Sequence, residues 1–96
     1  MTDDKLKMIL QVSAAQLVDD EVEATSVANA LVNETIRFRD KLKSEAGIIL
    51  TIEDTQIALD AFMAALDGEP LPAELTSEQM TLAQIYIDRM TLFKES

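Results

Sequence analysis

Residues 21–45, EVEATSVANALVNETIRFRDKLKSE, contain the pattern that decides the fold. Small or apolar residues recur here at alternating steps of four and three positions. They are Ala24, Ala28, Leu31, Thr35, Phe38 and Leu42. This spacing forms one stripe along an α-helix, and such a stripe packs against other helices. The sequence therefore predicts a long helix over 21–45 within a helical bundle.

Acidic residues crowd the start of this helix, at Asp19, Asp20, Glu21 and Glu23. Asp20 and Glu23 have the spacing of a capping box, and acids in a first turn also favour the helix dipole. A metal site would need further oxygen ligands from elsewhere, and no pattern in the chain supplies them. We interpret the cluster as a helix start and not as a binding site for a metal or a basic partner.

Three further helices are predicted around the long one. They span about 3–18, 52–67 and 77–94. Four helices joined by short loops, with no paired strands, predict the fold class all-α and a small four-helix bundle. At 96 residues the chain is expected to form a single domain over 1–96.

Local signals mark where these helices begin and end. The predicted capping residues are Thr2, Thr51 with Asp54, and Thr76 with Gln79. Gly47 and Gly68 stand where helices end, because glycine readily adopts the left-handed conformation. The short apolar run 48–50 has no strand to pair with, so we interpret it as a connector that plugs one end of the core.

The predicted helix 77–94 is apolar around about two-thirds of its circumference. A surface helix of a monomer needs an apolar arc of only about 100°. Either this helix is central in the bundle, or its surplus face packs on a second chain. The residues assigned to such an interface are Leu82, Ile85, Leu92 and Phe93. We expect a homodimer through this helix, with Tyr86 at the rim.

Charge is strongly negative and unevenly distributed. The formal net charge is −10, and no Lys or Arg occurs over 44–88. The predicted acidic face comprises Glu53, Asp60, Asp67, Glu69, Glu74 and Glu78. Such a face can attract a basic protein surface and speed association. The alternative is a face that is only solvated and partly paired with the basic run 37–43.

Composition excludes several classes of function. Without His or Cys, a Ser or Cys catalytic triad and a thiolate metal site are impossible. A carboxylate pair or a Ser–Lys dyad is compatible with the residue types, but no motif groups them. The acidic balance argues against direct binding to nucleic acid or to anionic membranes. We expect no enzyme activity, no cofactor, no metal and no membrane span, and a cytoplasmic location.

Protein–protein binding is the function that these observations favour. We expect a non-enzymatic regulator, inhibitor or adaptor that docks a basic surface of its partner. One alternative is a structural or assembly subunit, or a chaperone, that packs through the helix 77–94. A weaker alternative is an acidic mimic of nucleic acid that inhibits a DNA- or RNA-binding protein.

Overall fold

Four α-helices build the fold of this chain. The structure is a computed structural model that describes residues 3–95, with side chains described over 3–92. The helices are α1 (Asp3–Leu17), α2 (Glu21–Ala46), α3 (Ile52–Leu66) and α4 (Ser77–Glu95). The all-α, four-helix prediction is confirmed, and each helix begins and ends within one residue of its predicted bounds. Thr2, the predicted cap of the first helix, lies outside the described residues.

Side-chain caps begin α2 and α3 as predicted. Asp20 is the N-cap of α2, and its Oδ1 accepts a hydrogen bond from the Glu23 N–H at 3.0 Å. Thr51 and Asp54 form a reciprocal capping box at the start of α3. The Asp54 N–H donates to Thr51 Oγ1 at 3.1 Å, and the Thr51 N–H donates to Asp54 Oδ2 at 3.2 Å. The acidic cluster before α2 is therefore used as a helix start.

A second capping box begins α4 and is joined to the first. The Thr76 N–H donates to Gln79 Oε1 at 3.1 Å, and the Gln79 N–H donates to Thr76 Oγ1 at 3.2 Å. The Gln79 amide then donates through Nε2 to Asp54 Oδ1 at 2.9 Å. Burial alone would raise the pKa of Asp54, but hydrogen bonds with Gln79 and Thr51 outweigh it and hold that pKa below its ordinary value. One carboxylate thus serves the starts of both α3 and α4.

The end of α2 matches the prediction, whereas the end of α3 differs from it in detail. Gly47 caps α2 in the left-handed conformation, with φ 67°, as expected. The cap of α3 is Asp67, and Gly68 adopts its positive φ of 93° one residue later. The connector between α2 and α3 plugs the core with Leu50 only. Its neighbour Ile49 is 72% exposed.

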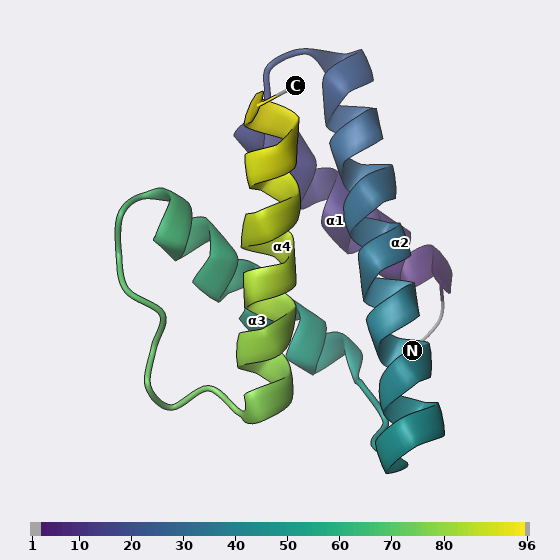
Figure 1. The fold of residues 1–96 in the computed structure, drawn as a ribbon. Coiled ribbons are helices and arrows are strands. Elements are labelled where there is room, and N and C mark those ends of the chain that lie inside the picture. Colours follow the sequence, from purple (N-terminus) through teal and green to yellow (C-terminus); the bar gives the residue numbers. More distant parts are fainter. Residues whose placement is uncertain (1–2, 96) are drawn as a thin grey trace.

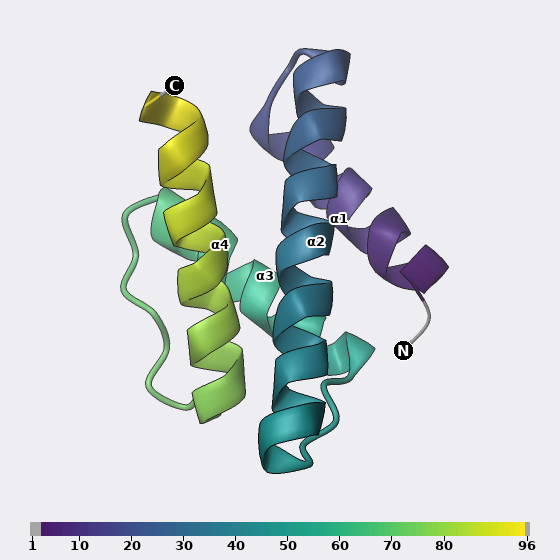
Figure 2. The same cartoon turned by 45° about the vertical axis from the view of Figure 1, so that its right-hand side comes forward.

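The helices form two pairs that pack on each other: α1 and α2 form a hairpin, whereas α3 and α4 begin side by side and are joined by the long loop 67–76 (Figure 1). α1 packs mainly on α2, and α3 packs mainly on α4. α2 and α4 run antiparallel side by side, while α1 and α3 cross obliquely behind them (Figure 1). The view turned by 45° shows the same two layers from the side (Figure 2). The pair α1/α2 meets the pair α3/α4 mainly through α2 and α4, whereas α1 and α3 contact each other much less.

The stripe predicted along α2 is its packing face. Ala28, Leu31 and Thr35 are buried at 1% exposure or less. The ends of the stripe, Ala24, Phe38 and Leu42, are partly buried and pack against the same core. The small residues lie where α1 approaches α2, which is consistent with close helix packing.

Helix α4 is central in the bundle, and this corrects the interface prediction. Leu82, Ala83, Tyr86 and Met90 are buried at 4% exposure or less within the single chain. α4 contacts both α2 and α3, so two helices cover its wide apolar arc. Assigning Leu82 to a dimer interface, and Tyr86 to its rim, is therefore wrong. The apolar surplus of this helix no longer argues for a second chain.

A buried hydrogen bond joins α2 to α4. The hydroxyls of Thr35 and Tyr86 lie 2.5 Å apart, and both residues are fully buried. Because the Thr35 hydroxyl donates its only proton to the Leu31 carbonyl at 2.8 Å, the Tyr86 hydroxyl donates to Thr35. Burial raises the pKa of the Tyr86 phenol more than this hydrogen bond lowers it. The phenol therefore stays neutral and acts as a permanent donor across the α2/α4 seam.

Candidate protein-binding groove

The predicted acidic face is mostly exposed. Glu78, in the first turn of α4, is the one partly buried member. The exposed members are Glu53, Asp60, Asp67, Glu69 and Glu74. The first three lie on one side of α3, as their seven-residue spacing predicts, and the last two lie in the loop before α4.

Basic side chains of α2 pair elsewhere. Arg39 Nη1 lies 2.8 Å from Asp3 Oδ1, and its Nε lies 3.2 Å from Asp40 Oδ1. Arg37 pairs with Glu34 at 3.5 Å. The hydrogen bond from Arg39 lowers the pKa of Asp3. Within the described part of the chain, none of the six acids of the predicted face has an ion-pair partner, so their charge is left for solvent or a partner.

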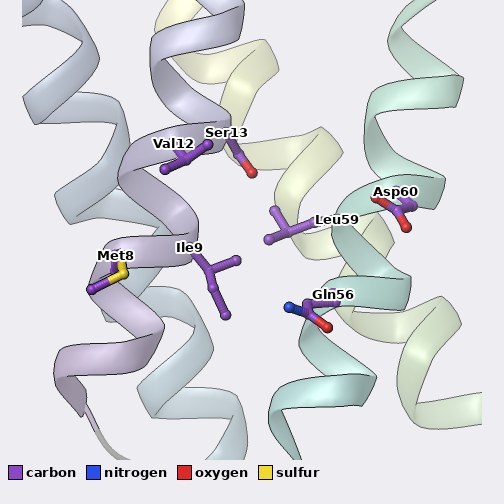
Figure 3. A pocket seen from close by; sticks show the side chains of 7 residues that line it. All are labelled: Met8, Ile9, Val12, Ser13, Gln56, Leu59 and Asp60. Carbon is purple, nitrogen blue, oxygen red and sulfur yellow. The ribbon is translucent and has the colours of Figure 1, made fainter.

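An open groove of about 460 Å³ lies between α1 and α3. Its lining consists of Met8, Ile9, Val12 and Ser13 from α1, and Gln56, Leu59 and Asp60 from α3. In Figure 3 the two helices rise in the same direction. Ile9, Ser13, Gln56 and Leu59 point into the space between them, whereas Met8, Val12 and Asp60 lie along its rim on their own helices. The groove is therefore lined mainly by apolar side chains, and its α3 wall carries the carboxylate of Asp60.

Helix α1 has two apolar sides, and this is why the groove is apolar. Leu6 and Leu10 are fully buried against the rest of the core. Met8 and Val12, four residues apart on a different side, are 65% and 57% exposed. Neither Met8 nor Val12 was predicted as a site residue, so the second side was missed. The i, i+4 spacing of Met8 and Val12 was the signal that could have found it.

The electrostatic surroundings of the groove are negative. Asp60 lines it, and Glu53 and Asp67 lie seven residues before and after Asp60 on the same side of α3. On α1, Lys5 is three residues before Met8 and shares that side of the helix. Three carboxylates therefore face one ammonium group along the two walls. A cation on the α3 side of the groove would be stabilised.

The polar groups of the groove favour recognition over chemistry. They are the hydroxyl of Ser13, the amide of Gln56 and the carboxylate of Asp60. Such groups can hydrogen-bond and attract positive charge. With no His or Cys in the chain, the usual bases and thiol nucleophiles that would turn this set into a catalytic site are missing.

The remaining predicted interface residues lie around a shallower hollow. Ile85 is half-buried and Leu92 is 56% exposed, and both line a space of about 210 Å³ between α2 and α4. Charged Glu34 and Asp88 line the same space. Phe93 lies among the residues whose side chains are not described. The exposed apolar area on α4 is therefore divided by charges, unlike the continuous apolar side of α1.

Over residues 3–92, no group of three or more acidic side chains gathers closely enough to hold a metal ion. Among the four helices that the structure describes, none combines the length and the hydrophobicity that crossing a bilayer demands.

Comparison of the chain with models of protein families, with curated proteins and with solved structures found no match.

Proposed function

We propose that this protein is a non-enzymatic binding protein of the cytoplasm, a small regulator, inhibitor or adaptor that docks another protein in the α1/α3 groove. The observation that carries the proposal is the exposure of Met8 and Val12 on the α1 rim of a groove to which α3 contributes Asp60. Exposed apolar side chains that gather in a hollow and are rimmed by charge are typical of protein-interaction sites.

The apolar part of the groove is sufficient to matter energetically. Full burial of a Val or Met side chain stabilises by about 1.5–3 kcal/mol. Covering the exposed parts of Met8 and Val12 would contribute on the order of 2 kcal/mol together, which is more than a tenfold gain in affinity. The unpaired acids of α3 add attraction that depends on salt concentration.

The direct test is capture of partners from a lysate of the source organism, with tagged wild-type protein and two matched variants. Val12→Ser removes an apolar wall of the groove, while Val22→Ser makes the same change at an exposed site outside it. A partner that binds wild type and Val22→Ser but not Val12→Ser supports the proposal. A partner set that is identical for all three proteins would refute it.

Assembly through α4 is a second candidate with a narrower basis. Leu92 is exposed and Ile85 is half-buried beside it, which is the part of the predicted interface that the fold leaves accessible. Homodimer formation through this patch predicts a salt-tolerant dimer that Leu92→Asp dissociates. Sedimentation of wild type and Leu92→Asp at several concentrations tests it, and an unchanged monomer for both would reject it.

Mimicry of nucleic acid has weaker support. Glu53 and Asp67 are fourteen residues apart and span about 21 Å along α3, with Asp60 between them. A DNA segment of that length carries about twelve phosphate charges. Three carboxylates over the same distance reproduce neither the density nor the spacing of phosphates. The acidic side of α3 is thus better suited to complement a basic protein segment.

A further inference from the structure

We infer that the α1/α3 groove receives an amphipathic α-helix of the partner, with Lys or Arg along the flank that faces α3. This inference rests on the proposed function and names the kind of segment that the groove fits.

The walls of the groove decide between a helical and an extended partner segment. Both walls are α-helices, whose backbone N–H and C=O groups are already hydrogen-bonded along each helix. An extended segment would find no strand edge here, and its own backbone groups would lack partners once buried. A helix satisfies its backbone internally and presents only side chains. Docking in a cleft between two helices is therefore favoured for a helix.

The spacing of the apolar side chains fits such a helix. Met8 and Val12 lie one helical turn apart on α1, and Leu59, which is 3% exposed, lies at the floor on the α3 side. An incoming helix with apolar residues at i and i+3 or i+4 can place one beside each of these exposed side chains. Methionine adapts its shape to different partners, so Met8 suits a surface that receives a foreign side chain.

A small molecule is a poorer occupant of the same space. Sites for small ligands bury about 70–90% of the ligand surface. Here the wall residues Met8 and Val12 are themselves more than half exposed, so the groove is open along its length. An elongated occupant that brings its own cover makes better use of this shape.

Charge complementarity selects a basic helix. Asp60 lines the groove, and Glu53 and Asp67 extend the negative charge along the same side of α3. The chain has no Lys or Arg over 44–88 to neutralise them, and its net charge of −10 repels a second copy of itself. Because Asp60 is on the α3 wall and Met8 and Val12 are on α1, the basic flank of the incoming helix should face α3 and its apolar side should face α1.

A pair of synthetic peptides tests this inference. The first is a designed helix with Leu at i, i+4 and i+7 and Lys along one flank. The second differs only in having Glu in place of those Lys residues. Binding is measured by NMR with isotope-labelled protein at low salt, following the methyl signals of Met8, Val12 and Leu59.

We expect the Lys peptide to shift these methyl signals and to bind at least tenfold more tightly than the Glu peptide. Asp60→Lys should weaken the Lys peptide roughly tenfold, while Glu74→Lys, an equal change of net charge in the loop before α4, should weaken it less than threefold. A central proline in the Lys peptide should abolish the shifts, because it breaks the helix.

Three results would overturn the inference. One is equal binding of the Lys and Glu peptides. Another is a set of methyl shifts that lie outside the groove, or equal weakening of Lys-peptide binding by Asp60→Lys and Glu74→Lys. Either result would mean unspecific attraction to an acidic protein. The third is no binding by any peptide while lysate capture still finds a partner that depends on Val12. In that case the proposed function stands and only the helical, basic partner is rejected.

Discussion

The two places where the helix pairs meet differ in how far their side chains are buried. At the α2/α4 seam, Leu31, Thr35 and Tyr86 are all fully buried, and a hydrogen bond between hydroxyls crosses the contact. At the α1/α3 seam, Met8 and Val12 are more than half exposed and border a groove of about 460 Å³. The same two helix pairs thus form one seam that is closed at its centre, beside the hollow of about 210 Å³ that Ile85 and Leu92 line, and one seam that is open.

This difference separates what holds the fold from what is free to bind. The closed seam, together with the core of each helix pair, fixes how the α1/α2 pair is placed relative to the α3/α4 pair. The open seam therefore does not have to be filled for the fold to persist. Met8 and Val12 at the open seam are more than half exposed and carry little of the stability, unlike the buried Leu59, so a partner can cover them without rearranging the core.

The largest expected effect comes from emptying the closed seam. Tyr86→Ala removes a fully buried ring that lies 5.8 Å from the ring of Phe62, and should lower the free energy of unfolding by about 3–5 kcal/mol. Small domains have only about 5–15 kcal/mol in total. Urea unfolding followed by circular dichroism measures this loss. Met8→Ala in the open seam is the control, and a similar loss for both would mean that the two seams are equivalent.

The capping boxes of α3 and α4 give the next largest effect. Gln79→Ala removes the acceptor for the Thr76 N–H and the donor to Asp54, and should cost about 1–2 kcal/mol of unfolding free energy. Gln84→Ala, at an exposed site in the same helix, is the control and should change it by less than about 0.5 kcal/mol. Equal losses for the two variants would mean that the link between the helix starts is dispensable.

The same link should make stability depend on pH. The folded-state pKa of Asp54 is lowered from its ordinary value of 3.8. Its contribution is therefore present above that value and is lost as the pH falls through the lowered pKa. Gln79→Ala should reduce the loss of stability below about pH 4 relative to wild type. Urea unfolding of both proteins from neutral to acid pH tests this, and parallel curves would contradict it.

The hydroxyl contact across the closed seam should have a smaller effect. Tyr86→Phe keeps the ring and removes only the donor to Thr35, so the expected loss is about 1 kcal/mol. Thr35→Val and the double variant complete a cycle that isolates the interaction between the two hydroxyls. A coupling energy near zero would show that packing alone closes this seam.

Local signals made most of the helix ends predictable. Capping boxes such as Thr51 with Asp54, and the left-handed Gly47, act over only a few residues, so their effect can be read from neighbouring letters. The stripe of α2 was also predictable, because helical periodicity is a local property. The joining of two capping boxes through Gln79 and Asp54, 25 residues apart, was not, since it depends on how the loop between α3 and α4 brings the two helix starts together.

Contacts between helices were the part that sequence reasoning could not supply. The composition of α4 indicated that its wide apolar arc must be covered, but not by what, and Leu82 is covered by the chain itself. Conversely, Met8 and Val12 could have faced a neighbouring helix, but they lie on a side of α1 away from the buried Leu6 and Leu10 and are more than half exposed. The acidic residues of α3 were predicted as a candidate site, whereas the groove beside them required the structure.

The smallest expected effect on stability is at the open seam itself. Val12→Ser should change the free energy of unfolding by less than about 0.5 kcal/mol, because the side chain is 57% exposed, and Val22→Ser, at 78% exposure, should behave alike. Urea unfolding of the two variants makes the comparison. If Val12→Ser lowered the free energy of unfolding by 1 kcal/mol or more while Val22→Ser did not, the groove would be part of what holds the two helix pairs together. Near-equal stability, combined with loss of partner capture by Val12→Ser alone, would assign the exposed side of α1 to binding.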